Sequence, residues 1–226
     1  MIEFRDVSLP MGTAHAIDRL NLTVARGEIL GLIGPIGSGK STTLKLLTGI
    51  IDGYGGQVLV DGLDLATNGA AIRARIGYMP GFIGAYNDLR VRDYLDLFAR
   101  ACRVDPATAR ARMGDLLRLA GLDGMEEAFI SSLEIEQRHR LAVIKTAIHD
   151  PSILLFDEPA VSLANDARIR LRELIGELAR VGGRTVVVCT NILTDLLGLC
   201  DRIGIMYGGR LLKLGLADEV ARCLTR

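Results

Sequence analysis

Residues 29–42 read ILGLIGPIGSGKST, and this stretch decides the fold. The apolar run ILGLI (29–33) is typical of a central strand that is covered on both faces. The glycine-rich segment GPIGSGKST (34–42) follows it and fits the pattern G-x-x-x-x-G-K-[ST]. Its last residues open the segment STTLKLL (41–47), which we expect to be helical. A buried strand, a glycine-rich loop and a helix in this order predict a loop that holds a phosphate group.

The residue types in this loop suit the chemistry of a nucleoside triphosphate. Glycines let backbone N–H groups approach phosphate oxygens closely, and the helix N-terminus adds its dipole. Lys40 is expected to neutralise the β- and γ-phosphate oxygens, and Ser41 to offer its hydroxyl to Mg²⁺. A glycine-rich turn with a surface lysine is the alternative, and the strand–loop–helix context argues against it. The candidate nucleotide-binding residues are Gly34, Pro35, Ile36, Gly37, Ser38, Gly39, Lys40, Ser41 and Thr42.

A second element lies in the segment ILLFDEP (153–159). Its apolar residues predict a strand, and Asp157 stands at the end, where a carboxylate can hold the Mg²⁺ shell, partly through water. Glu158 follows directly and is placed to polarise an attacking water, so it is the candidate catalytic residue. The alternative is a surface acidic pair after a core strand. Its occurrence together with the phosphate loop favours the nucleotide interpretation, with Asp157 as a nucleotide-site residue and Ser41 and Asp157 as candidate magnesium ligands.

The rest of the chain predicts a mixed α/β protein with one domain. NLTVARGEI (21–29) and GGQVLVDG (55–62) are typical of strands with glycine turns, so we expect antiparallel strands in the first third. VRDYLDLFARAC (91–102) and PATARARMGDLLRLAGL (106–122) have helical periodicity. From residue 152 on, SILLF, DARIRLRELIGELARV, RTVVVCT and LTDLLGLC alternate as strands and helices, which predicts a parallel sheet. RIGIMYGGRLLKLG (202–215) is expected to be a hairpin.

The composition indicates location and partners. The 226 residues carry 27 Lys and Arg against 27 Asp and Glu, and aromatic residues make up only 4%. Because there is neither a basic stripe nor an aromatic stacking platform, nucleic acid is not an expected partner. No apolar run reaches the ~18 residues of a membrane span, and the N-terminus MIEFRDVSL lacks a signal pattern. We therefore expect a cytoplasmic chain that meets a membrane only through a partner.

Three segments of the sequence resemble the nucleotide-binding subunits of ABC transporters: GPIGSGKST, HDPSILLFDEP and CDRIGIMYGGRLLKLG. The resemblance covers essentially the whole chain, with matching order and spacing of the segments. It implies a P-loop NTPase (RecA-like) α/β core, an antiparallel β subdomain and an inserted helical subdomain at about residues 86–150, all in one ATP-binding domain of residues 1–226. It also implies ATP and Mg²⁺ as cofactors, and a transmembrane permease subunit that holds the chain peripherally on the cytoplasmic face of the membrane.

In that family two such domains pair head to tail, and each ATP lies between the phosphate loop of one and the signature segment of the other. The signature, Leu-Ser-Gly-Gly-Gln in the family, falls here on Leu133, Glu134, Ile135, Glu136 and Gln137. Both glutamates stand where a helix is expected to begin, which suits the helix dipole. Glu134 would nevertheless point a carboxylate at the partner's triphosphate, and Ile135 adds bulk where backbone should approach. We therefore predict that this signature no longer binds ATP.

Further positions depart from the family pattern. Asn191 stands at the switch histidine; it can donate a hydrogen bond to the γ-phosphate but cannot carry a proton. Gly81 stands at the Q-loop glutamine, which in the family reaches Mg²⁺ and water. Ala164 stands at the D-loop aspartate, and Asp166 lies two residues further on. Met11 stands at the aromatic residue that stacks on adenine, where its thioether can still pack on the base.

Three functions remain open after these comparisons of residues. The first is an ATP-binding transporter subunit that is catalytically degenerate, hydrolyses ATP weakly alone and pairs with a second, competent ATP-binding subunit as a heterodimer. The second is a homodimeric transporter ATPase with very low turnover. The third is a nucleotide-dependent binding module without a role in transport. The segment after Gly81 and the compact C-terminus resemble ATPases that serve exporters, and the membrane subunit would choose the transported substrate.

Overall fold

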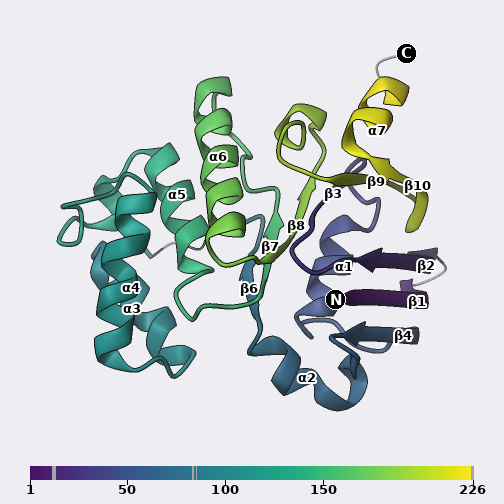
Figure 1. Cartoon of the computed structure of the whole chain (residues 1–226), viewed down its shortest axis with the longest axis horizontal. Helices are drawn as coiled ribbons and strands as arrows, with labels where there is room; N and C mark the ends of the chain where they lie inside the picture. The colour runs from purple at the N-terminus through teal and green to yellow at the C-terminus, as the bar shows by residue number, and fades with distance from the viewer. Residues whose placement is uncertain (12–13, 83, 85, 225–226) are drawn as a thin grey trace.

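Two β-sheets form the framework of the protein (Figure 1). The computed structural model describes residues 1–11, 14–82, 84 and 86–224, without the side chains of Met11, Ala14 and Leu224. The larger sheet has six strands in the order β10-β9-β3-β8-β7-β6, and the smaller has four in the order β2-β1-β4-β5. The strands are β1 (Ile2–Met11), β2 (Ala14–Val24), β3 (Ile29–Ile33), β4 (Gly55–Val60), β5 (Leu63–Asp64), β6 (Ile76–Met79), β7 (Ile153–Asp157), β8 (Thr185–Thr190), β9 (Arg202–Tyr207) and β10 (Arg210–Leu216).

The strand β3 lies inside the larger sheet, as its apolar run predicts. It pairs in parallel with β8 on one side and with β9 on the other, and β7 pairs in parallel with β8. Ile33 at the end of β3 is paired with Thr190, and Asp157 at the end of β7 is paired with Cys189. The carboxyl ends of β3, β7 and β8 therefore meet at one edge of the sheet. Ligands of open α/β sheets bind at this edge, so the fold brings the two predicted motifs together there.

The helices are distributed unevenly around the sheets. They are α1 (Lys40–Leu47), α2 (Leu65–Arg73), α3 (Val91–Ala101), α4 (Pro106–Leu119), α5 (Ile135–Lys145), α6 (Asn165–Val181) and α7 (Ala217–Leu224), with short 3₁₀ turns η1 (Ile130–Ser132) and η2 (Leu193–Asp195). Helices α3, α4 and α5 lie together at the end of the molecule opposite the antiparallel sheet (Figure 1). Among the described residues, no helix combines the length and the apolar character that crossing a membrane requires.

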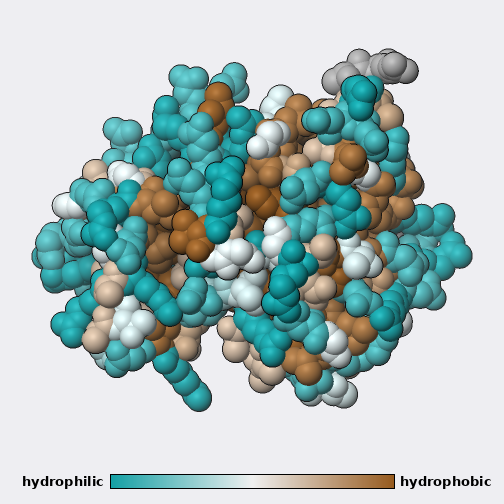
Figure 2. Space-filling model, viewed as in Figure 1, coloured by the Kyte–Doolittle hydropathy of each residue, from teal (hydrophilic) through white to brown (hydrophobic). Residues whose placement is uncertain are grey.

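The packing of α3 follows from its periodicity. It buries Val91, Tyr94, Leu95 and Ala99 on one face, as the helical spacing predicts. The ring of Tyr94 meets the ring of Phe98 edge to face, with centroids 5.0 Å apart. Figure 2, in the same view as Figure 1, shows hydrophobic side chains at the surface where the region of α3–α5 meets α6. This junction thus leaves apolar surface in contact with solvent.

The predicted fold class is confirmed, although one predicted helix is wrong. A parallel core sheet, an antiparallel sheet and helices between β6 and β7 are all present. The terminal hairpin is also confirmed, with its turn at Gly208 and Gly209 in left-handed conformations. The predicted helix at LTDLLGLC (193–200) is wrong, because only the turn η2 and irregular structure occur there. Gly198 has a φ of 74°, which is incompatible with a continuous right-handed helix.

Candidate functional site

The phosphate loop connects β3 to α1 and depends on glycine at particular positions. Gly39 has a φ of 102°, and a Cβ atom there would lie 2.7 Å from the carbonyl oxygen of Ala16. A Cβ atom on Gly34 would lie 2.1 Å from the carbonyl oxygen of Met206. Any side chain at either position would therefore clash with backbone. The sequence forms a tight loop that ends at the N-terminus of α1, where backbone N–H groups favour an anion.

Lys40 is folded into the loop that it follows. Its side chain is 4% exposed, and its Nζ donates hydrogen bonds to the carbonyl oxygens of Gly34 (2.6 Å) and Pro35 (3.1 Å) and approaches Ser38 Oγ at 3.4 Å. These acceptors carry no formal charge. A phosphate oxygen that entered the loop would give the ammonium group a charge-assisted partner, which is the stronger interaction. The position of Lys40 therefore suits the role predicted from the sequence.

Ser41 and Asp157 form the oxygen-rich part of the site. Ser41 Oγ donates a hydrogen bond to Asp157 Oδ1 at 2.8 Å, which joins the start of α1 to the end of β7. Burial raises the pKa of Asp157, against the opposing effects of the Ser41 hydrogen bond and of Lys45 and Lys40. A hydroxyl and a carboxylate are the hard oxygen ligands that Mg²⁺ prefers, so these two residues fit a magnesium ion.

The Q-loop position lies beside this pair but has no side chain. A Cβ atom on Gly81 would lie 3.4 Å from the backbone oxygen of Asp157 and 3.9 Å from its Oδ2. The backbone of the segment after β6 thus passes close to Asp157, one of the candidate magnesium ligands. The amide that a glutamine would place there is missing, so Mg²⁺ would have one protein group fewer nearby.

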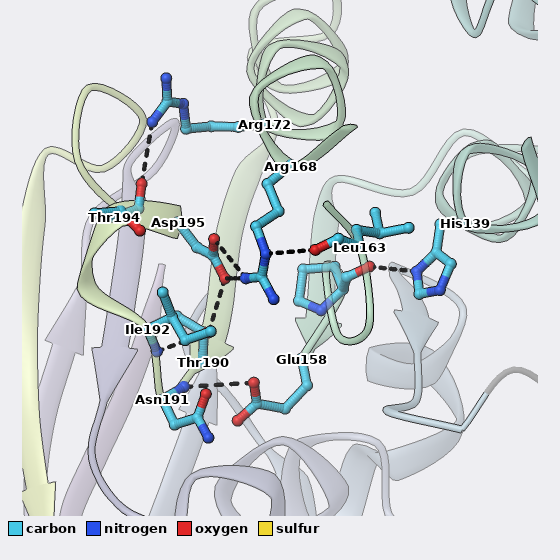
Figure 3. A network of polar contacts seen from close by, with 11 residues as sticks. His139, Glu158, Leu163, Arg168, Arg172, Thr190, Asn191, Ile192, Thr194 and Asp195 are labelled. Carbon is cyan, nitrogen blue, oxygen red and sulfur yellow. Dashed lines mark hydrogen bonds and ion pairs between the residues drawn. The ribbon is translucent and has the colours of Figure 1, made fainter. Parts of the chain in front are cut away.

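Glu158 follows Asp157 and turns toward the loop after β8 (Figure 3). The backbone N–H of Asn191 donates to Glu158 Oε2 at 3.4 Å, a long contact. Burial raises the pKa of Glu158, while Lys40 opposes the effect. Glu158 also has a φ of 48°, an uncommon conformation for a residue with a side chain. The carboxylate and the switch position predicted from the sequence are thus adjacent.

A pocket of about 280 Å³ surrounds the phosphate loop. Its lining consists of His15, Ala16, residues 36–42 and Glu158. His15 was not predicted, because it lies on the antiparallel strand β2, far from the motif in sequence. The side chain of Met11, the predicted adenine contact, lies outside the described residues. In the described part of the chain, none of residues 133–137 lines this pocket, so the signature segment does not meet the chain's own phosphate loop.

The signature segment forms the start of α5. Leu133 is buried, whereas Glu134 is exposed and Ile135 is 55% exposed. The side chain of Gln137 accepts a hydrogen bond from the backbone N–H of Glu134 at 2.9 Å, as in a capping box. The departures from the family pattern therefore make a sound helix start. Glu134 and Ile135 reach solvent, where a second subunit could meet them.

Glu136, the second carboxylate of the signature segment, is held by ion pairs within the chain. Arg170 of α6 donates two hydrogen bonds to it, each of 2.7 Å, and Arg140 also pairs with it. The Glu136 side chain is 16% exposed. The hydrogen bond from Arg170 is the main cause that lowers the pKa of Glu136 to about 2, with Arg140 contributing. Its charge is thus neutralised within the chain.

The D-loop position carries no carboxylate, because Ala164 stands there. Ala164 is exposed and precedes α6 without a side-chain cap for the helix, and Asp166 is exposed in the first turn. The spatial arrangement thus brings together Lys40, Ser41, Asp157 and Glu158 with the positions of Gly81 and Asn191. It leaves the segment 133–137 on a separate surface.

Comparisons with known proteins identify the family of this chain. The ABC transporter family model matches residues 17–161. Nod factor export ATP-binding protein I of Paraburkholderia xenovorans (strain LB400) is 34% identical over 218 residues, which are 95% of this chain and 70% of that protein. The probable multidrug ABC transporter ATP-binding protein YbhF of Escherichia coli (strain K12) is 32% identical over 220 residues, 97% of this chain and 38% of that protein.

Solved structures lead to the same family. The ATP-binding subunit of an ABC transporter superposes with a TM-score of 0.85 at 26% identity, covering 100% of this chain and 93% of that one. The cbiO1 protein of Clostridium perfringens, part of the ABC transporter complex cbiONQ, has a TM-score of 0.89 at 22% identity, covers 98% of this chain and 90% of that one, and supports the fold alone. Because the ABC transporter family model matches residues 17–161, and because the two relatives named above are more than 30% identical over nearly the whole chain, this chain belongs to the ABC transporter family as one of its nucleotide-binding domains.

Proposed function

We propose that the chain binds MgATP in its own phosphate-loop pocket and serves an exporter from the cytoplasmic face of the membrane. The observation that supports ATP binding is the burial of Lys40 against the phosphate loop. Beside it, Ser41 Oγ donates a hydrogen bond of 2.8 Å to Asp157 Oδ1 at the end of β7. The two relatives above are named for export and for multidrug transport, which supports an exporter. The residues expected to contact nucleotide are those of the loop 34–42 together with Asp157.

Substitution of Lys40 tests ATP binding. Lys40→Ala is expected to weaken MgATP binding at least about tenfold, because a phosphate-contacting cation is worth more than ~1.4 kcal/mol. Titration with a fluorescent ATP analogue measures the affinity. Lys213→Ala is the control, because Lys213 is exposed on β10 and its ammonium group contacts Cys223. Equal affinities of the wild type and Lys40→Ala would mean that the loop does not hold nucleotide.

The chain further suits a heterodimer in which a second ATP-binding subunit is the competent one. One composite site would use Lys40, Asp157 and Glu158 with the partner's signature, and the other would use the partner's phosphate loop against residues 133–137. A homodimer would carry the altered signature in both sites and turn over very slowly, and a binding module would have no permease. Identification of the chains that co-purify decides among these functions: permease plus second ATPase, permease alone, or neither.

Restoring part of the signature tests its role in the assembled complex. Glu134→Ser with Ile135→Gly removes the exposed carboxylate and the branched side chain, while Glu136 keeps its ion pairs. ATP affinity and turnover of the complex are expected to rise, because freed backbone N–H groups at a helix start can meet an anion. Adding Glu136→Gly is expected to destabilise the chain. If the folded double variant has unchanged affinity and turnover, residues 133–137 do not face nucleotide.

The segment 82–95, FIGAYNDLRVRDYL, is the proposed contact with the permease. Residues 83 and 85 lie outside the described residues. A groove of about 260 Å³ lies between this segment and α5, and Phe82, Tyr86, Tyr94 and Ile135 contribute to its lining. Phe82 is 77% exposed. Phe82→Ser is expected to reduce the amount of permease that co-purifies, whereas Leu212→Ser, at a residue of β10 that is 62% exposed, is expected to leave it unchanged.

A further inference from the structure

Residues 158–163, here called the strap, connect β7 to α6 and contain two strained positions. Glu158 has a φ of 48° and Ser162 a φ of 65°, although neither is glycine. Left-handed conformations of such residues persist only where surrounding contacts hold them. The contacts that hold the strap therefore also determine where the carboxylate of Glu158 points.

Side chains from two helices hold the strap at its ends (Figure 3). The ring nitrogen Nδ1 of His139, on α5, lies 2.7 Å from the carbonyl oxygen of Pro159. Burial lowers the pKa of His139, which is 5% exposed, so the neutral ring donates its Nδ1 proton to that carbonyl. At the other end, Arg168 Nε of α6 donates to the carbonyl oxygen of Leu163 at 3.0 Å.

The same Arg168 side chain also holds the loop after β8. Its Nη1 donates to both carboxylate oxygens of Asp195, at 3.0 and 2.8 Å. The two side chains are 17% and 8% exposed, so the pair is largely shielded from solvent. Residues 190–195, here called the switch loop, fold onto this carboxylate. Thr190 Oγ donates to Asp195 Oδ2 at 3.1 Å and accepts from the backbone N–H of Ile192 at 3.1 Å.

Arg168 therefore bridges the two loops that carry Glu158 and Asn191. The direct contact between those two residues is a long 3.4 Å bond from a backbone N–H. The backbone N–H of Glu158 also donates to the carbonyl oxygen of Cys189 at 2.8 Å, which fixes the first residue of the strap to the end of β8 but does not hold its far end at Leu163. The planar guanidinium of Arg168 instead uses different nitrogens for the strap carbonyl and for Asp195. A lysine has a single nitrogen on a flexible stem and cannot reproduce this fork.

We propose that Arg168 and Asp195 are positioning residues that lock the strap to the switch loop and thereby hold Glu158 beside Asn191 over the bound nucleotide. The proposal rests on ATP binding at the phosphate loop for its functional meaning. Neither residue is among the described residues that line the pocket at the phosphate loop. Both act through the backbone of the loops that they join.

A purely structural ion pair makes a different prediction from a positioning bridge. Arg168→Lys keeps the opposite charges together, so a structural pair would survive, whereas a bridge would lose the bond to Leu163 or to Asp195. Asp195→Asn removes the charge that orders the switch loop and that anchors the guanidinium of Arg168, so the bond from Arg168 to Leu163 is expected to loosen as well. Arg172→Ala is the matched control, because Arg172 donates to the carbonyl oxygen of Thr194 at 3.0 Å from the same helix. It thus contacts the switch loop without the strap.

Hydrogen–deuterium exchange of the full chain tests the proposal. Peptides that cover residues 158–164 and 190–196 are compared in the wild type and the three variants, first without nucleotide. Arg168→Lys and Asp195→Asn are expected to exchange about tenfold faster in both peptides, the effect of losing one charge-assisted hydrogen bond. Arg172→Ala is expected to leave 158–164 unchanged. Wild-type exchange of 158–164 in Arg168→Lys or in Asp195→Asn would overturn the proposal.

A second arm with MgATP separates this proposal from ATP binding itself. In the wild type, MgATP is expected to slow exchange at residues 34–42 and in both loops, whereas in Arg168→Lys it should slow residues 34–42 only. An equally large rise of exchange across β3, β7 and β8 in the variants would mean that the pair only stabilises the fold, which also overturns the proposal. A wild type without protection at residues 34–42 would refute ATP binding, and the comparison without nucleotide would still decide the role of Arg168.

Discussion

Glu136→Gln tests whether the second carboxylate of the signature serves the fold or faces a partner's nucleotide. In the wild type, Arg170 and Arg140 neutralise this carboxylate, and the pKa of Glu136 is about 2 against an ordinary 4.5. That difference corresponds to roughly 3 kcal/mol of stabilisation of the folded state. Arg170 is 51% exposed, so solvent screens its part of the interaction. We expect Glu136→Gln to lower the free energy of unfolding by about 1–2 kcal/mol at pH 7.

The pH dependence of the stability provides a second test of the role of Glu136. The pKa of Glu136 is lower in the folded state, so its stabilisation is fully present above about pH 4.5, the pKa expected when unfolded. This stabilisation is lost as the pH falls from about 4.5 through about 2. The stability difference between the wild type and Glu136→Gln should therefore shrink over this window.

Urea unfolding between pH 7 and pH 2 measures both effects, with Glu134→Gln as the control. Glu134 is exposed on the same helix start and has no ion pair with Arg170. Its variant should differ from the wild type in stability at pH 7 by less than Glu136→Gln does. If Glu136→Gln is as stable as the wild type at every pH, the ion pairs do not stabilise the fold, and Glu136 is free to face a partner.

Three other predictions concern the nucleotide site. The isolated chain should release phosphate from MgATP slowly, because Asn191 cannot carry a proton. Steady-state assays measure the rate of phosphate release, and fast release that Glu158→Gln abolishes would contradict this prediction. His15→Ala should weaken ATP binding by about tenfold but leave tripolyphosphate binding unchanged, as expected for a ring that stacks on the base. Equal losses of affinity for both ligands in calorimetric titrations would argue against contact between His15 and the base. Gly81→Gln should make ATP binding more dependent on Mg²⁺ by placing an amide beside Asp157, and an unchanged dependence on titration at several Mg²⁺ concentrations would count against that placement.

Motifs whose meaning is local could be predicted from the sequence. The phosphate loop depends on residues within one short segment, and the strand before it and the helix after it confirm its context. The position of Asp157 at the end of a buried strand was also predictable, because an apolar run leads up to it. Local patterns failed where they were weak. The helix α2 was missed, since Asn68 interrupts its helical geometry and Gly69 follows. The helix predicted at residues 193–200 was wrong because Gly198 breaks it.

Contacts between distant segments could not be predicted in this way. Glu136 and Arg170 are 34 residues apart, and Arg168 and Asp195 are 27 apart. The spacing within one helix indicated that Glu136 suits a helix start, but only the packing of α6 against α5 shows which cation neutralises it. The role of a charged residue can therefore be assigned only when the elements that face it are known.

The neutralisation of Glu136 changes the electrostatic argument about the signature. Two free carboxylates at ~4 Å from a triphosphate would each repel it by about 4 kcal/mol at an effective dielectric constant of ~20. With Glu136 paired, Glu134 is the carboxylate of the signature that remains exposed, so the direct repulsion falls on one residue. Ile135 adds a steric obstacle beside it, at 55% exposure. On the proposed placement of the signature, residues 133–137 therefore form a helix start that presents one repulsive charge to a partner's nucleotide. Changes at Glu134 and Ile135 can test this effect without disturbing the ion pairs of Glu136.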